Sequence, residues 1–155
     1  PATGAVPLPA AAWMLLAVIR PAYPIIPEAA WRAFIGTEQV RANFSDRFLL
    51  RSFSQQTEED AVQLRLFWEG IAVPDFDYSI FVHLVDANGQ VVSQGDVGLG
   101  QSAGYLPTRW AAGDMVVEQI SLPIPEHLPV GEYEIHTGVY NWISGERLAV
   151  KGNGD

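Results

Sequence analysis

The stretch Asp77–Gly98, DYSIFVHLVDANGQVVSQGDVG, decides the fold because it contains two strand patterns joined by a tight turn. The first pattern, YSIFVHLVD, is apolar on both alternating faces, which is typical of a central strand covered on both sides. Asn88-Gly89 follows and is a strong hairpin signal, since both central positions of a type I′ turn need a positive φ. The segment therefore predicts an antiparallel hairpin whose second strand ends in a polar cluster at Gln94 and Asp96.

The same two-residue period recurs on both sides of this hairpin. In AVQLRLFWE it places Val62, Leu64, Leu66 and Trp68 on one face, so Trp68 is predicted to lie in the core. Further strand patterns are VRANFSDRFLLRSF, DMVVEQISLPIP, EYEIHTGVYNW and SGERLAV. Together they predict an all-β domain over residues 39–155. Its expected fold is an antiparallel β-sandwich of about seven strands, similar to immunoglobulin or carbohydrate-binding-module folds.

The segment before residue 39 has a different composition. Residues 1–20 carry no charge before Arg20, and the apolar run from Ala10 to Ile19 is too short to span a bilayer alone as a helix. We expect residues 1–20 to be embedded in a membrane or a partner, with a core strand or helix and a signal-peptide remnant as alternatives. Residues 21–38 predict a proline-rich linker with one short helix over Glu28–Phe34. Because the chain starts with Pro, we expect it to be processed, trimmed or a fragment.

Composition excludes several classes of function. The net charge is −9 with only nine Lys and Arg, so the chain lacks the basic stripe of a nucleic-acid binder, and anionic membrane surfaces are disfavoured. The chain has no Cys, which removes disulfides, thiolate catalysis and Cys-based metal sites. We predict no cofactor and no metal.

The histidines and carboxylates do not form a catalytic motif. His83, His127 and His136 lack metal-ligand spacing and are interpreted as ordinary hydrogen-bonded side chains. Acidic residues flank several strand ends, but any acidic β-protein offers such pairs by chance. We therefore predict no catalytic residue, and a small soluble hydrolase is the least favoured function.

The connection Gly98–Asp114 is the candidate binding segment, because it is far longer than the about two to five residues that a hairpin needs. It contains Tyr105 and Trp110. With Gln94 and Asp96 these aromatic residues could form a shallow carbohydrate-binding platform. The alternative is that Tyr105 and Trp110 close the open end of the sandwich. Trp142, in the turn YNWISGE, has the same two interpretations.

The chain also resembles a known family between Val40 and Val150, through the patterns FVHLVD..G, PT.W..GD, LP.G.Y and G.Y....GERL. It is similar to a domain at the C-terminus of bacterial multi-pass membrane proteins that resemble polyprenyl-phosphate-sugar-dependent glycosyltransferases. The resemblance implies a β-domain on the extracytoplasmic side, attached through a last membrane helix and a proline-rich linker. It transfers no catalytic residue, because the membrane spans that would hold the catalytic acidic residues are absent from this sequence.

The sequence therefore predicts a non-catalytic, membrane-associated, extracytoplasmic accessory domain that scaffolds an assembly or contacts glycan weakly. Its expected partners are membrane or membrane-protein helices through residues 1–20, and carbohydrate. The alternative is an independent structural subunit of a membrane complex, anchored by its apolar N-terminus.

Overall fold

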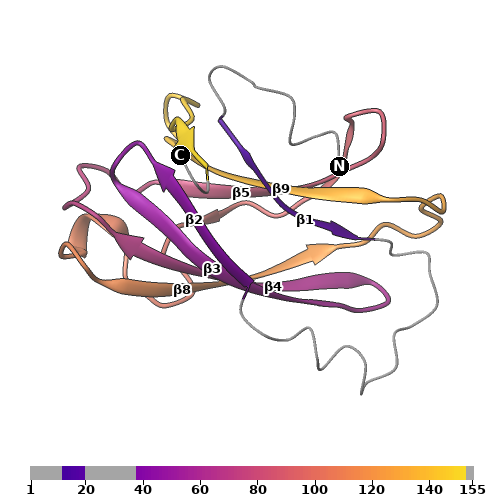
Figure 1. The fold of residues 1–155 in the computed structure, drawn as a ribbon, viewed down its shortest axis with the longest axis horizontal. Helices are drawn as coiled ribbons and strands as arrows, with labels where there is room; N and C mark the ends of the chain where they lie inside the picture. Colours follow the sequence, from indigo (N-terminus) through magenta and orange to yellow (C-terminus); the bar gives the residue numbers. More distant parts are fainter. Residues whose placement is uncertain (1–11, 20–37, 153–155) are drawn as a thin grey trace.

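The computed structural model describes residues 12–19 and 38–152, which form two antiparallel sheets packed face to face (Figure 1). The first sheet has the order β1-β9-β5-β6, with β7 also paired to β5, and the second has the order β10-β2-β3-β4-β8. This confirms the predicted all-β sandwich. The strands are β1 Met14–Ile19, β2 Glu38–Phe44, β3 Phe48–Thr57, β4 Ala61–Gly70, β5 Ser79–Val85, β6 Val91–Gln94, β7 Val97–Gly98, β8 Met115–Pro123, β9 Tyr133–Tyr140 and β10 Val150–Lys151.

The core lies between the inner faces of the two sheets, and strict alternation along the strands builds it. Every second residue of β8 is buried, while its neighbours face outward. Trp68 on β4 is completely buried and packs against Phe44 with 5.2 Å between ring centroids, which confirms its predicted place in the core. β8 thus contributes one apolar face, as the two-residue period requires, whereas β5 is buried on both faces.

The hairpin predicted at Asn88-Gly89 is present, but the predicted turn type is wrong. Among the three central residues only Gly89 has a positive φ, of 80°, whereas a type I′ turn would need a positive φ at Asn88 as well. Asp86 and Gln90 close a three-residue loop through the Asp86 N–H bond to the Gln90 carbonyl at 2.9 Å. The Asp86 carboxylate also accepts the N–H groups of Asn88 and Gln90, both at 2.9 Å. These side-chain bonds favour the longer loop, with Gly89 as its left-handed residue.

Residues 12–19 and 38–152 form ten strands rather than about seven, because two of the predicted strand patterns are divided and one strand was not predicted. VRANFSDRFLLRSF forms β2 and β3, and the return strand QVVSQGDV is divided into β6 and β7. The additional strand is β1, which pairs antiparallel with β9 and buries Leu16 and Ile19 in the core. Residues 14–19 therefore belong to the sandwich, which corrects its predicted start at residue 39 and fits the core-strand alternative for this part of the chain.

The predicted helix over Glu28–Phe34 and most of the predicted linker lie outside the described residues. Within residues 12–19 and 38–152, no helix is long and apolar enough to cross a membrane. The only helical element of that part is a 3₁₀ turn over Pro107–Arg109, in the long connection between β7 and β8.

Candidate functional site

The structure shows that Trp110 closes one end of the sandwich. Its side chain is only 1% exposed and meets Phe48 edge-on with 5.6 Å between ring centroids. The indole N–H donates to the carbonyl of Tyr105 at 2.6 Å. Because the indole is almost fully buried and its N–H is bonded within the protein, Trp110 cannot stack on a sugar. The alternative interpretation, a plug of the sandwich end, describes this residue.

Tyr105 belongs to the same closed arrangement. Its hydroxyl lies 2.7 Å from the Asp114 carboxylate and 2.8 Å from the Arg109 carbonyl. The Ala111 N–H and then the Tyr105 hydroxyl stabilise the ionised Asp114 and lower the pKa of its carboxyl group. The carboxylate thus ties the middle of this loop to its end, so the length of the loop reflects internal bonding around a plug.

The other two predicted residues, Gln94 and Asp96, lie on the outer face of the first sheet. Gln94 is the register partner of His83 on β5. Asp96 accepts a hydrogen bond from the Tyr140 hydroxyl at 3.1 Å, and burial, together with the charge of Asp96, raises the pKa of that phenol. The predicted platform is therefore divided: its aromatic half faces the core, and its polar half stands beside a groove that the sequence did not indicate.

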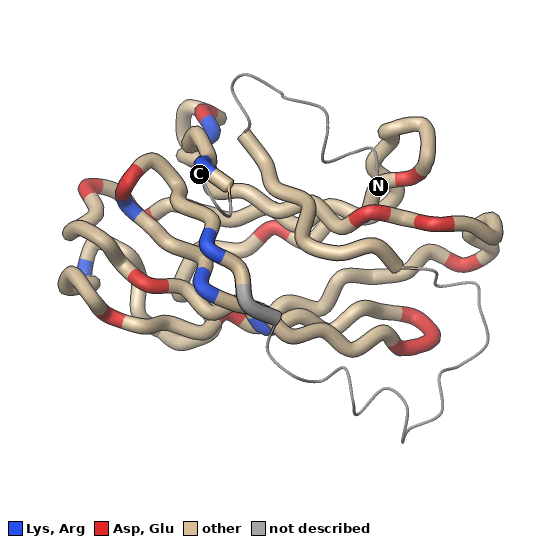
Figure 2. Tube along the Cα trace, viewed as in Figure 1, with Lys and Arg blue, Asp and Glu red and all other residues tan. Residues whose placement is uncertain are grey.

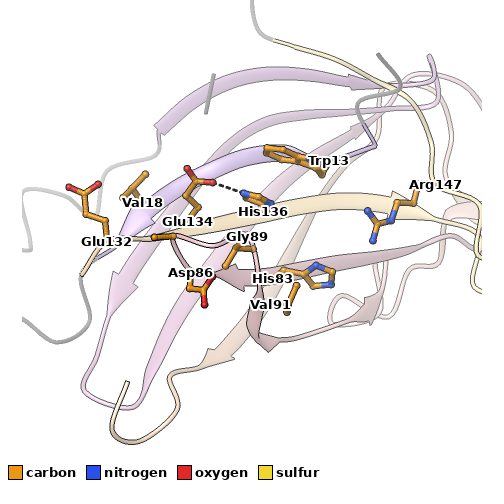
Figure 3. Close-up of a pocket in the computed structure, with 12 residues that line it drawn as sticks. Trp13, Val18, His83, Asp86, Gly89, Val91, Glu132, Glu134, His136 and Arg147 are labelled. Atoms are coloured by element: carbon orange, nitrogen blue, oxygen red, sulfur yellow. Dashed lines mark hydrogen bonds and ion pairs between the residues drawn. The ribbon is translucent and has the colours of Figure 1, made fainter. Parts of the chain in front are cut away.

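This groove has a volume of about 590 Å³ and lies over the outer faces of β9 and β5, between β1 and the β5–β6 turn (Figure 3). Its chemically relevant lining residues are Trp13, His83, Asp86, Glu134, His136 and Arg147. The carboxylates of Glu134 and Asp86 gather toward one end, and Arg147 with His83 marks the other. The outer face of this sheet is therefore hollowed and chemically polarised.

An aromatic stack forms one wall of the groove. The indole of Trp13 lies parallel to the imidazole of His136, with 3.8 Å between ring centroids and 6° between planes. His136 Nε2 is in turn 2.8 Å from Glu134 Oε1. These contacts fix all three side chains, and the indole is held against the sheet by packing and by the orientation of the imidazole beneath it.

The opposite end is built on Phe81, whose ring covers Gly138 so closely that a Cβ at residue 138 would collide with it. The Arg147 guanidinium carbon stands 4.3 Å from the centre of the Phe81 ring, and the His83 ring is 4.6 Å from it. Burial lowers the pKa of His83; the charges of Arg147 and His136 act in the same direction, and Asp96 opposes them. His83 is thus held toward its neutral form beside a cation.

His83 and His136 are register partners on β5 and β9, although they are far apart in the chain. Local sequence patterns do not show which strands pair, so the two histidines could only be interpreted separately from the sequence. The one signal in the sequence is that His83 and His136 each lie next to an apolar residue in a predicted strand. Within the described ranges, no group of three or more His, Asp or Glu side chains could hold a metal ion.

Comparisons with protein-family profiles, curated proteins and solved structures found no match to this chain.

Proposed function

We propose that this chain is a non-catalytic, extracytoplasmic accessory β-sandwich of a membrane protein or complex, and that it contacts glycan weakly through the groove. The observation that carries the proposal is the Trp13–His136 stack beside Glu134, at the edge of a groove on an outer sheet face. The resemblance of the sequence to a domain of glycosyltransferase-like membrane proteins supports the membrane and extracytoplasmic parts.

The groove has the two kinds of group that a neutral saccharide needs. A flat indole offers apolar contact to the C–H face of a sugar ring, and carboxylates accept hydrogen bonds from its hydroxyl groups. Trp13 supplies the first kind, while Glu134 and Asp86 supply the second. Because the groove is open and its polar groups compete with water, we expect a dissociation constant near millimolar, or about −4 kcal/mol.

The His136–Glu134 pair does not by itself indicate catalysis. Among the described residues, no hydroxyl group is hydrogen-bonded to His136 or His83, so neither imidazole stands against a nucleophile in this structure. The pair instead fixes the ring on which Trp13 stacks. This is a positioning role, which suits a binding surface.

The experiment is an NMR titration of the full chain with manno- and gluco-oligosaccharides, which follows the indole and backbone signals. We expect the Trp13 indole and the amides of β9 and β5 to shift with millimolar affinity, while Trp142 does not respond. Trp13→Ala should abolish the shifts, and Trp142→Ala, a control on another surface, should leave them unchanged. A Trp13 indole that stays unmoved at tens of millimolar saccharide would refute glycan contact in the groove.

A second candidate is an independent structural subunit of a membrane complex, anchored by its apolar N-terminus. The anchor of this candidate lies outside residues 14–19, because Leu16 and Ile19 are buried in the core of the sandwich. The mass of the native polypeptide separates the two candidates. A value near 17.0 kDa indicates a separate subunit, and a several-fold larger value indicates a domain of a multi-pass protein.

A further inference from the structure

The turn after β9 presents two adjacent apolar side chains to solvent. Trp142 is 58% exposed and Ile143 is 69% exposed. Single exposed apolar residues are ordinary on protein surfaces, but a neighbouring Trp and Ile at the tip of one turn form a small protruding apolar surface. We call Trp142 and Ile143 the apolar tip.

The apolar tip is mounted on a fixed turn. The indole N–H of Trp142 donates to the Asp77 carbonyl at 3.0 Å, and the ring leans on Phe76 with 5.8 Å between centroids. The Asn141 side chain accepts the N–H of Ile143 at 2.9 Å. These contacts hold both side chains outward, so little conformational freedom would be lost when a partner covers them.

The N-terminal part of the chain joins the sandwich at this same end. Because β1 is antiparallel to β9, with Met14 opposite Thr137 and Ile19 opposite Tyr133, the start of β1 lies toward the end of β9. Figure 1 shows this start beside the β9–β10 connection. The described start of β1 therefore lies at the end of the sandwich that carries the apolar tip.

Charge is distributed unequally between the two ends of the sandwich. The turns 58–60, 86–90 and 124–132 at the far end contain acidic residues and no Lys or Arg. The acidic residues of these turns and of the adjoining start of β9 are Glu58, Glu59, Asp60, Asp86, Glu126, Glu132 and Glu134 (Figure 2). At the end with the apolar tip, Lys and Arg are interspersed with Asp and Glu (Figure 2). The end with the apolar tip is therefore less negatively charged than the other end, so negative headgroups of a lipid layer repel it less.

We propose that the apolar tip inserts into the interfacial layer of a lipid bilayer, so that this end of the sandwich faces the membrane. The exposed part of the Trp142 ring offers flat apolar surface to that layer, while its N–H is already bonded to the Asp77 carbonyl, and Ile143 supplies the deeper apolar contact. The net charge of −9 makes zwitterionic lipid the preferred surface over anionic lipid. The inference rests on the membrane-associated part of the proposed function and is independent of the groove.

The absence of cysteine from the sequence permits a direct test with single labels. Ile143→Cys and Val130→Cys introduce one thiol each at positions of similar exposure, 69% and 71%, at opposite ends of the sandwich. Each full-length variant is labelled with an environment-sensitive fluorophore and mixed with phosphatidylcholine vesicles, and co-sedimentation measures binding. We expect the label at position 143 to shift to the blue and brighten, and the label at position 130 to stay unchanged.

A double variant of the unlabelled chain, Trp142→Ala with Ile143→Ser, should lower the vesicle partition coefficient by about tenfold or more, because it removes most of the apolar surface that would enter the lipid. If the chain sediments with vesicles but the label at 143 does not respond, the orientation is wrong while membrane association stands. If the chain does not bind vesicles at all, the inference and the membrane part of the proposed function fail together. A Trp142 indole signal that shifts with saccharide, without a lipid response at 143, would assign the tip to sugar and overturn the inference.

Discussion

Trp110→Ala tests whether the long loop is a plug, and the structure sets the size of the effect. A buried tryptophan removes about 200 Å² from water, which at about 25 cal/mol per Å² is about 5 kcal/mol. Core Trp-to-Ala changes cost about 3–5 kcal/mol in practice. Trp110 is 1% exposed and also donates a hydrogen bond at 2.6 Å, so the upper half of that range applies, at about 4–5 kcal/mol. This is a large part of the about 5–15 kcal/mol that stabilises a typical domain.

Two matched variants make the result interpretable. Trp110→Phe keeps a ring against Phe48 but removes the bond to the Tyr105 carbonyl, so we expect a loss of about 1–3 kcal/mol. Trp142→Ala removes a tryptophan that is 58% exposed and should cost about 1 kcal/mol or less. Urea denaturation followed by far-UV circular dichroism measures all three through the midpoint at constant m. If Trp110→Ala and Trp142→Ala lose equal stability, Trp110 is not a plug and the reasoning is refuted.

Two further predictions concern buried positions. Burial raises the pKa of Glu118, which is 1% exposed, so its contribution to stability is present below its unfolded pKa and is lost as pH rises through its folded pKa. Glu118→Gln should therefore raise the urea midpoint at pH 7 relative to the wild type, and the difference should shrink toward pH 4; a Gln variant that is less stable at pH 7 would contradict the raised pKa. Gly138→Ala places a methyl group against the Phe81 ring and the Ala12 carbonyl, and should cost about 1–3 kcal/mol while accelerating hydrogen exchange in β1 and β9; an unchanged melting temperature would show that Phe81 does not cover this position.

The sandwich was predictable because its signals are local. The alternation of apolar and polar residues in AVQLRLFWE correctly predicted that Trp68 is buried, because a strand with one apolar face packs that face against the core. The turn at Asn88-Gly89 was predicted as a hairpin and mistaken in type. The Asp86 carboxylate, two residues earlier, accepts two backbone N–H groups and selects the longer loop. The dipeptide Asn88-Gly89 by itself does not show that the Asp86 carboxylate favours a longer loop over a type I′ turn.

Residues 14–19 were misassigned for a physical reason. MLLAVI is apolar at every position, and that pattern fits a membrane segment as well as a strand. In the structure its inward residues join the core, while the outward Val18 lines the groove. Because the outer face of this sheet is hollowed and partly covered, β1 carries apolar residues on both of its sides. The alternation of apolar and polar residues that marks a half-exposed strand is therefore absent from MLLAVI.

The groove could not be predicted because it depends on strand order. His83 and His136 become neighbours only when β5 pairs with β9, and Trp13 reaches His136 only when β1 is added at the edge of that sheet. Each of these pairings joins segments that are remote in the chain and leaves no trace in local periodicity. The long loop suggested a site because length is visible in a sequence, whereas burial of its tryptophan is not.

The two proposed surfaces are connected by one strand, and this determines how they would work together. β9 carries Glu134 and His136 on its outer face and leads directly into Trp142 and Ile143. With the apolar tip in a bilayer, the Arg147 end of the groove is the end nearer the membrane, and the acidic end points away from it. A saccharide in the groove would then be held beside the membrane rather than against it. If Trp13→Ala loses glycan binding and keeps vesicle binding, the groove and the apolar tip are separate surfaces. If either Trp13→Ala or the double variant Trp142→Ala with Ile143→Ser loses both glycan binding and vesicle binding, the groove and the apolar tip form one site.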